Sequence, residues 1–326
     1  MKGRFLIIII CLFTLCGCSD YAESNSQYMV SAIGFDSDGK NIIASTQTVI
    51  IGSNGEEKQE TKVFTAKGKT PAQAVFNISG YLSKSLLFDH CGVVAIGKGI
   101  SKETLGEIFD YSNDEKNLNL GVYFVCADSA DELLNADPVS FVASGYDIMG
   151  IIEKASDETG ILYQNRFYEI KALEAKKGKV FSLPFFECKE DGIKMNGRNI
   201  YSDRQFVTSI DENESYLYSV ICNSNKGGKI ILDGQKAKIN KMHTSFKYDY
   251  KNETVNINLK TVFSFEYKSK NFKKVLQKDA NDFIQKMTVL CNTDVFGFDD
   301  RIYTRNSSLY ESIKDGYSFK TEYTAK

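Results

Sequence analysis

The most specific chemical signal in this 326-residue sequence is a cysteine that follows an apolar leader. Lys2 and Arg4 precede an apolar run over residues 5–15, and residues 15–18 read Leu-Cys-Gly-Cys. A positive start and a short apolar run are typical of a secretory signal, and the run is shorter than the roughly 17–25 residues of a membrane-spanning helix. The small glycine leaves the next peptide bond accessible to a signal peptidase, and the thiol of Cys18 can take up diacylglycerol. We therefore predict that the leader is removed and that Cys18 is lipidated.

The predicted modification gives the mature chain a membrane anchor. Residues 1–17 are then the signal peptide, and the polar residues 18–27 form a lipidated tether. A buried acyl chain contributes about 0.8 kcal/mol per methylene, so two chains on Cys18 hold a protein stably on a membrane. The alternative is an ordinary signal peptide that happens to be followed by a cysteine.

Two glycine-containing segments carry part of a ligand-binding motif. Residues 92–98 begin like a phosphate-binding loop, but Gly99 stands where Ser or Thr would bind magnesium, and the segment is apolar like a strand. Residues 36–39 begin like a calcium loop, but Asn41 and Gln47 stand where an EF-hand has glycine and glutamate. We interpret the first segment as a buried strand and the second as a hairpin turn.

The remaining polar residues show no recognisable catalytic or metal-binding pattern. The only two histidines, His90 and His243, have neither a recognisable nucleophile motif nor zinc-ligand spacing around them. His90 could pair with Asp89 or with a partner protein, but a structural role is the simpler interpretation, and His243 falls on the polar side of a strand. We expect a protein that is not an enzyme and that holds no cofactor and no metal.

The net charge of the chain argues against nucleic acid as a partner, and its cysteines argue against a disulfide framework. Loss of the leader removes two cations and no acids, which takes the formal net charge from −2 to −4. Such a chain has no basic excess for phosphates, so we expect no binding of nucleic acid. Besides Cys18, the mature chain has scattered cysteines, most of them in apolar stretches, which predict buried thiols rather than a disulfide framework: Cys91, Cys126, Cys188, Cys222 and Cys291.

Residues 28–190 are predicted to form a mixed α/β region. Two β-rich runs at 28–35 and 41–51, joined by an Asp/Gly turn, predict a hairpin. Thr70 followed by Pro71 predicts the start of a helix, because Thr can cap the first turn and Pro fits its first position. Beyond this helix, short apolar runs typical of strands alternate with helical segments.

Residues 191–326 are predicted to form an antiparallel hairpin packed on a long helix. Apolar and polar residues alternate over 242–250 and again over 255–267, which indicates strands with one buried face. The stretch 272–290 then repeats apolar residues at three and four positions, as an amphipathic helix does. The polar composition of residues 188–197 places the main boundary between the two regions. We predict an α+β (mixed α/β), multi-domain fold.

Five segments, taken in chain order, carry a family likeness. They are Cys18 with Asp20 and Glu23, Gly68-Lys69-Thr70 with the helix after it, residues 87–90 (Leu-Phe-Asp-His) with 93–97, Leu183-Pro184 with Gly197, and Asp294-Val295-Phe296-Gly297-Phe298. In this order they resemble the Ger(x)C family of spore germination lipoproteins, the C subunits of GerA-type nutrient germinant receptors. The last segment is the most specific, because five residues match a family signature directly after an amphipathic helix. The sequence departs from the family pattern at Ser19, where tryptophan is usual, and at Asp299, where the signature has a second glycine.

The resemblance implies a mixed α/β protein of about three small domains on the outer surface of the spore inner membrane. Its partners would be a polytopic B subunit and a membrane A subunit of the receptor. The family has no established catalytic residues, so the resemblance implies none. The expected function is that of a lipid-anchored, non-enzymatic receptor subunit required for nutrient-triggered spore germination. The alternatives are a lipid-anchored solute-binding protein of a membrane transporter and an anchored hydrolase.

Overall fold

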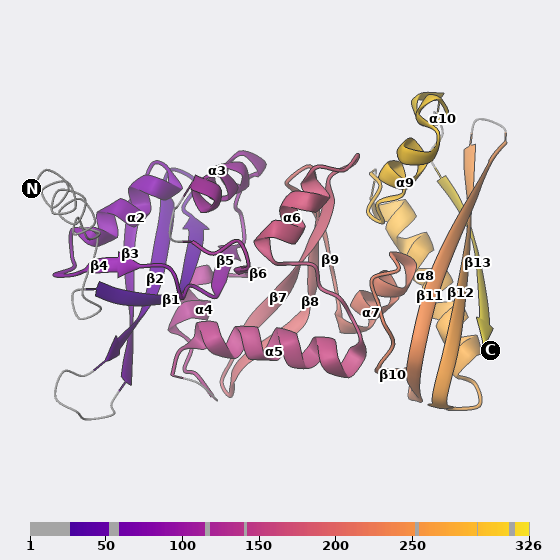
Figure 1. Ribbon diagram of the computed structural model, residues 1–326, viewed down its shortest axis with the longest axis horizontal. Helices are drawn as coiled ribbons and strands as arrows, with labels where there is room; N and C mark the ends of the chain where they lie inside the picture. The colour runs from indigo at the N-terminus through magenta and orange to yellow at the C-terminus, as the bar shows by residue number, and fades with distance from the viewer. Residues whose placement is uncertain are drawn as a thin grey trace, which may run out of the picture.

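The structure is a computed structural model that describes residues 27–51, 59–114, 118–139, 142–251, 254–291, 293–312 and 317–325. The strands of these residues form two sheets that follow one another along the long axis of the molecule (Figure 1). The larger sheet has nine strands and the smaller has four. The predicted signal peptide, Cys18 and all but the last residue of the predicted tether lie outside the described residues.

The large sheet has parallel strands in its centre and antiparallel strands towards both edges. Its order is β3-β2-β1-β5-β6-β7-β8-β9, and β4 pairs with β1. The neighbours β1, β5, β6 and β7 run parallel to one another, whereas β1–β3 and β7–β9 are antiparallel. The bounds are β1 (Gln27–Ser37), β2 (Ile42–Ile51), β3 (Gln59–Gly68), β4 (Ser85–Leu87), β5 (Val93–Gly97), β6 (Tyr123–Ala127), β7 (Val180–Lys189), β8 (Gly192–Ser202) and β9 (Gln205–Ile210).

The predicted N-terminal hairpin is confirmed as β1 and β2, and Asp38 fixes its turn. The Asp38 carboxylate accepts hydrogen bonds from the backbone N–H of Lys40 at 3.0 Å and of Asn41 at 2.8 Å. It also accepts one from the ammonium of Lys67 at 2.8 Å. The bond to Lys67, followed by those to the backbone, holds the pKa of Asp38 well below its ordinary value. The segment that begins like a calcium loop is therefore a hairpin turn, in which the Asp38 carboxylate is hydrogen-bonded to groups of the protein.

Helices cover both faces of the large sheet, which explains its continuous apolar strands. In the fully buried strand β5, Val94 and Ile96 pack into one core cluster with α2, α3 and α6. Val93 and Ala95 pack into the other cluster, with α4 and α5. The bounds of these helices are α2 (Pro71–Ser79), α3 (Lys102–Asp114), α4 (Ala130–Asn135), α5 (Ser144–Thr159) and α6 (Phe167–Glu174).

The large sheet continues across the boundary predicted near residue 190. β7 and β8 form an antiparallel hairpin there, and β9 adds to its outer edge. Pro184 lies in β7, a central strand, next to a register shift between Pro184 and Phe186. A proline is tolerated at such a bulge because no ladder hydrogen bond needs its missing N–H. The polar residues 188–197 are thus the end of one strand, a tight turn and the start of the next.

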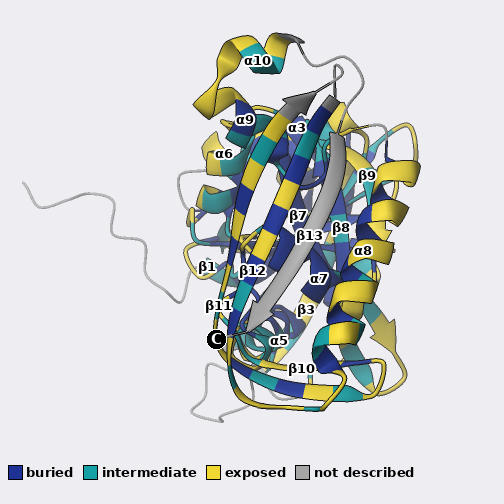
Figure 2. Cartoon of the chain, turned by 90° about the vertical axis from the view of Figure 1, so that its right-hand side faces the viewer, coloured by how far each residue is buried: buried dark blue, intermediate teal, exposed yellow. Residues whose placement is uncertain are grey.

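The small sheet confirms the alternation predicted from the sequence. Buried and exposed positions alternate along β11 (Figure 2). Thr244 and Phe246 are buried, and His243 is exposed. Phe272, at the start of α8, packs edge-to-face on Phe265 of β12, with ring centroids 5.9 Å apart. The C-terminal elements are α7 (Glu212–Ile221), β10 (Lys229–Leu232), β11 (Gln235–Lys251), β12 (Thr254–Lys268), α8 (Phe272–Leu290), α9 (Phe298–Arg305), α10 (Ser307–Ser312) and β13 (Tyr317–Ala325).

The predicted fold class is confirmed: the protein is a mixed α/β, multi-domain chain with a separate C-terminal sheet and a long amphipathic helix. The buried side chains of α8 belong to a core cluster that extends from the small sheet to α4 and α5. None of the described helices combines the length and the apolar character needed to span a bilayer.

Candidate functional site

A cavity of about 250 Å³ lies where the large sheet meets the C-terminal elements. Strands β7 and β8 and the segments before them form one wall. The end of α7 and the start of α9 form the other. The lining comes from residues 162–164, from residues between 173 and 182, from Arg198, from residues between 218 and 224, and from residues between 296 and 301.

Arg198 of β8 is the most unusual residue of this cavity. It is only 1 % exposed. The strand register explains its position, because Arg198 and Ile200 point to the same inward side of β8. Among the described residues, its guanidinium makes one hydrogen bond, from Nη1 to the hydroxyl of Ser182 at 3.3 Å. Nε and Nη2 have no protein acceptor there.

Two tyrosines cover the Arg198 guanidinium. Its central carbon lies 4.5 Å from the ring centroid of Tyr163 and 5.7 Å from that of Tyr218. Such cation–π contacts stabilise a charge without using its N–H donors. Burial lowers the pKa of Arg198 below its ordinary value and raises those of both tyrosines. An arginine nevertheless stays protonated in a protein, so the cavity contains a buried positive charge.

The charged residues that line the cavity are mostly cationic. They are Lys176, Lys177, Arg198 and Arg301 on the positive side and Asp300 on the negative side. Asp300 accepts a hydrogen bond from the backbone N–H of Lys177 at 3.2 Å. The guanidinium of Arg301 donates to the carbonyl oxygen of Cys222 at 2.6 Å. The lining residues therefore carry a net positive charge, which favours an anion.

Gly197 places Arg198 in this position. Its φ of 81° is in the left-handed region, where a side chain is strained. A Cβ at Gly197 would also lie 1.9 Å from the carbonyl oxygen of Ile210 in β9. Only glycine fits this close approach of two strands.

Asp294 shapes the opposite wall. Its Oδ1 accepts from the backbone N–H of Phe296 at 2.9 Å, and its Oδ2 accepts from that of Asp299 at 2.8 Å. Gly297 follows with a φ of 73°, and α9 begins at Phe298. Burial raises the pKa of Asp294 to about 6, against the opposing effect of these backbone bonds.

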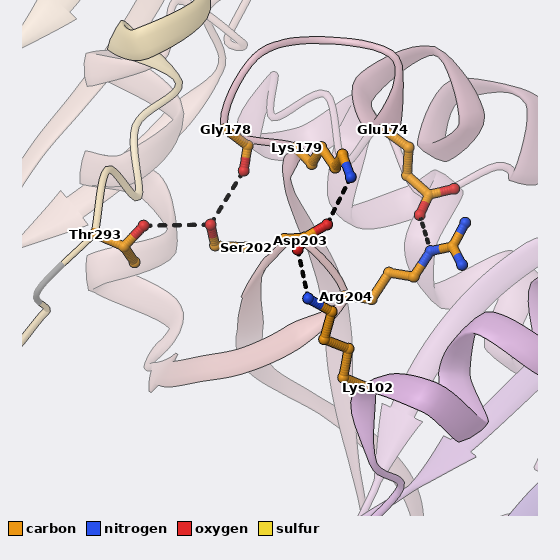
Figure 3. Close-up of polar contacts among 8 residues, drawn as sticks. All are labelled: Lys102, Glu174, Gly178, Lys179, Ser202, Asp203, Arg204 and Thr293. Carbon is orange, nitrogen blue, oxygen red and sulfur yellow. Dashed lines mark hydrogen bonds and ion pairs between the residues drawn. The ribbon is translucent and has the colours of Figure 1, made fainter.

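The turn between β8 and β9 fixes the segment that leads into β7 (Figure 3). Both turn residues, Asp203 and Arg204, have a positive φ, of 47° and 66°. The Asp203 carboxylate pairs with Lys102 of α3 and with Lys179, the latter at 2.8 Å. Arg204 pairs with Glu174 of α6 at 2.5 Å. The two lysines lower the pKa of Asp203, with the hydrogen bond from Lys102 as the first cause.

Ser202 extends the same arrangement to the C-terminal part of the chain (Figure 3). Its hydroxyl donates to the carbonyl oxygen of Gly178 at 3.1 Å and lies 3.3 Å from the hydroxyl of Thr293. Thr293 directly precedes Asp294. Both walls of the cavity are therefore tied to the β8–β9 turn.

A second cavity, of about 350 Å³, also contains an arginine, but this one is paired. Arg166 lies 3.7 Å from Glu153 and donates to the hydroxyl of Tyr123. The Tyr123 hydroxyl in turn donates to Glu153 at 3.0 Å. Because its charge is balanced, this second cavity is a weaker candidate for an anion than the one at Arg198.

Comparison with known proteins decides the family. A protein-family model described as the spore germination protein N-terminal domain matches residues 20–187. A second, described as spore germination B3/GerAC like, C-terminal, matches residues 196–325. The chain belongs to the Ger(x)C family of spore germination proteins.

A solved structure shares the Ger(x)C fold with this chain. The crystal structure of the GerBC protein matches with a TM-score of 0.55 at 15% identity, and the match covers 90% of this chain and 97% of that one. At this identity the match shows a common fold. No curated protein matches the sequence.

The other candidate residues from the sequence analysis form no common site among the described residues. His90 is exposed in a turn and His243 is exposed on β11, so the two histidines share no site. The segment 92–98 contains strand β5 and is no phosphate loop. Cys18, the predicted lipidation site, lies outside the described residues.

The thiols fit the predicted pattern in most positions. Cys91, Cys126 and Cys291 are buried, Cys222 is half-buried, and Cys188 is exposed; all five are unpaired among the described residues. Burial raises the pKa of Cys91 and Cys126 to about 12, so these thiols are not nucleophiles. In the part of the chain that the structure describes, no three His, Cys, Asp or Glu residues gather as metal ligands.

Sequence reasoning missed Arg198 and the cavity around it. One signal was present: Arg198 and Ile200 occupy alternate positions of a strand, so a charge falls on the apolar side. The two Ger(x)C-like segments at 183–197 and 294–298 also flank this cavity. The sequence alone does not show that they meet.

Proposed function

We propose that this Ger(x)C protein is the lipid-anchored, non-enzymatic C subunit of a spore nutrient germinant receptor, required for nutrient-triggered germination. The observation that carries the proposal is the pair of family matches, over residues 20–187 and 196–325, in chain order. The likeness to the GerBC protein over 90% of the chain supports a common architecture. The proposal assigns no catalytic residue and no cofactor.

The proposal gives the protein a place and partners. Lipid on Cys18 anchors the chain to the outer surface of the spore inner membrane, after removal of residues 1–17. The residues after Cys18 separate the anchor from β1, which begins at Gln27. The partners are the polytopic membrane A and B subunits of the same receptor. Within the chain, the proposed division is residues 28–190 and residues 191–326.

Deletion of the gene tests the functional part of the proposal. In a strain whose other receptors of this family are absent, the deletion should slow or abolish germination with at least one nutrient. Loss of refractility after addition of each nutrient measures the response, and a plasmid copy of the gene should restore it. An unchanged response to every nutrient that triggers the parent strain contradicts the proposal. An immunoblot that finds the protein in growing-cell membranes and not in spores favours the solute-binding alternative.

Replacement of the anchoring cysteine tests the location. Cys18→Ala should move the protein from the spore inner-membrane fraction to the soluble fraction, because the acyl chains provide the membrane affinity. The matched control is Cys188→Ala, which removes an exposed thiol from β7 and should leave the protein in the membrane fraction. Equal membrane association of Cys18→Ala and the parent protein would contradict lipid anchoring at this residue.

A further inference from the structure

The cavity at the junction of the two sheets contains an arginine with one free edge. Arg198 uses Nη1 for Ser182, whereas Nε and Nη2 have no acceptor among the described residues. These two nitrogens lie on the same edge of the planar guanidinium. Their N–H bonds are parallel and match the spacing of the two oxygens of a carboxylate.

We propose that this cavity binds a small carboxylate through a bidentate pair with Arg198. The proposal goes beyond the function proposed above and does not depend on it. It rests on geometry, because Arg198 lines the cavity and is 1 % exposed. The two unpartnered nitrogens are covered by the surrounding side chains, so a carboxylate that pairs with them must displace part of this packing.

The surroundings of Arg198 favour an external anion over an internal one. Burying a charge without a partner of opposite sign is costly, and proteins normally pair it. Asp300 is the only carboxylate among the described lining residues, and it accepts from the backbone of Lys177. The rings of Tyr163 and Tyr218 stabilise the guanidinium, but they cannot accept in the plane of its free edge. A bound carboxylate would satisfy both donors and neutralise the charge.

The volume of the cavity limits the rest of the ligand. It encloses about 250 Å³, below the roughly 300–1,000 Å³ of pockets for drug-sized molecules. Leu162, Val180 and Phe181 contribute apolar surface beside the polar groups. The cavity therefore suits a carboxylate with a short side chain, such as an α-hydroxy or α-amino acid.

Binding would also connect two parts of the fold. Arg198 and Ser182 belong to the large sheet, whereas Tyr218 and Gly297 belong to the C-terminal elements. A ligand that contacts both walls adds an interaction that is present only when they are packed together. It should therefore stabilise the folded chain against heat.

The test measures ligand-dependent melting of the full-length protein in detergent. The probes are acetate, lactate and glycine, each compared with its uncharged amide, and inorganic phosphate. At least one carboxylate should raise the melting temperature in a saturable manner, and its amide should not. Saturation-transfer NMR of the same carboxylate gives its affinity.

Two variants of one residue link the response to the free edge. Arg198→Lys keeps the charge but loses the side-on pair of donors, and it should weaken binding about tenfold to a hundredfold. Arg198→Met removes the buried charge. It should abolish the response while leaving the ligand-free melting temperature equal or higher, because replacing a buried charge by an apolar residue is often neutral or stabilising. If Arg198→Met fails to fold, Arg198→Lys carries the test.

Matched changes at another arginine serve as the control. Arg305 of α9 is exposed and does not line the cavity. Arg305→Lys and Arg305→Met should keep the affinity of the parent protein. An unchanged affinity in Arg198→Lys, a response to phosphate alone, or no response to any carboxylate would each overturn the proposal. None of these results would affect the germination function, which the gene deletion tests separately.

Discussion

Asp294 should make the stability of the protein depend on pH in a range where most carboxylates do not titrate. Burial raises its pKa from 3.8 to about 6 in the folded chain. In the unfolded chain the carboxyl returns to its ordinary value. Between these two values the folded state binds more protons than the unfolded state, so the free energy of unfolding falls as pH rises. This contribution is fully present below the unfolded value and is lost as pH passes through about 6.

The size of the effect follows from the two pKa values. A shift of about two pKa units corresponds to about 3 kcal/mol over the whole range, and about 1 kcal/mol of it falls between pH 5 and pH 7. For a chain of this size, 1 kcal/mol changes the melting temperature by about 2–4 °C. The acids whose pKa is lowered, such as Asp203 and Glu187, act at more acidic pH and in the opposite direction.

Asp294→Asn removes this titration and should flatten the melting temperature between pH 5 and pH 7. Burial also raises the pKa of Asp279 in α8, so a small slope should remain. Melting curves at pH 5, 6 and 7 give the slopes. The control is Asp282→Asn, which removes an exposed carboxylate from α8. A full parental slope in Asp294→Asn would refute the reasoning.

Two further changes test local structure through the melting temperature. Gly197→Ala should destabilise the protein strongly, because its Cβ would overlap the carbonyl oxygen of Ile210 in addition to the positive φ. The control is Gly39→Ala, because Gly39 has a φ of 82° and open space around it; this change should cost only the left-handed strain, about 1–2 kcal/mol. An equal loss of stability in the two variants would show that the overlap at Gly197 is absent. Thr70→Ala should cost about 1 kcal/mol, because the hydroxyl accepts from the backbone N–H of Gln73 at 3.2 Å; an unchanged melting temperature would show that this cap is not needed.

Local patterns predicted the elements whose formation depends on near neighbours. The alternation over 242–250 is enough for a strand with one wet face, and β11 buries Phe246 while exposing His243. The capped start of α2 depends on Thr70 and Pro71 alone. In each case the physical cause lies within a few residues of its effect.

The boundary between the sheets depends on contacts that the sequence pattern does not contain. A polar stretch such as 188–197 has the same composition in a linker and in the turn of a hairpin. In this chain β7 and β8 pair on both sides of it, and β9 completes the edge of the large sheet. Long-range pairing, rather than local composition, decides where the large sheet ends.

The sequence could not predict the Arg198 cavity, for the same reason. Its features come from Tyr163, Ser182 and Tyr218, which are distant from Arg198 in sequence. An arginine in a strand usually indicates an exposed face. Here Tyr218 of α7 and Tyr163, from a different segment, cover Arg198 and make it buried. Arg198 and Ile200 are two residues apart in a strand, which indicates that Arg198 shares the inward face. This spacing does not show which groups surround the charge.

The two segments with unusual backbone geometry can now be given one physical explanation. Gly197 adopts a left-handed conformation so that β8 can approach β9 and turn Arg198 inward. Gly297 adopts the same conformation where Asp294 closes a turn before α9. The first segment forms one wall of the cavity and the second forms the other. These two segments also carry the family likeness. The junction that they build holds the buried charge of Arg198 between its walls, and the carboxylate proposed to bind there would contact both walls.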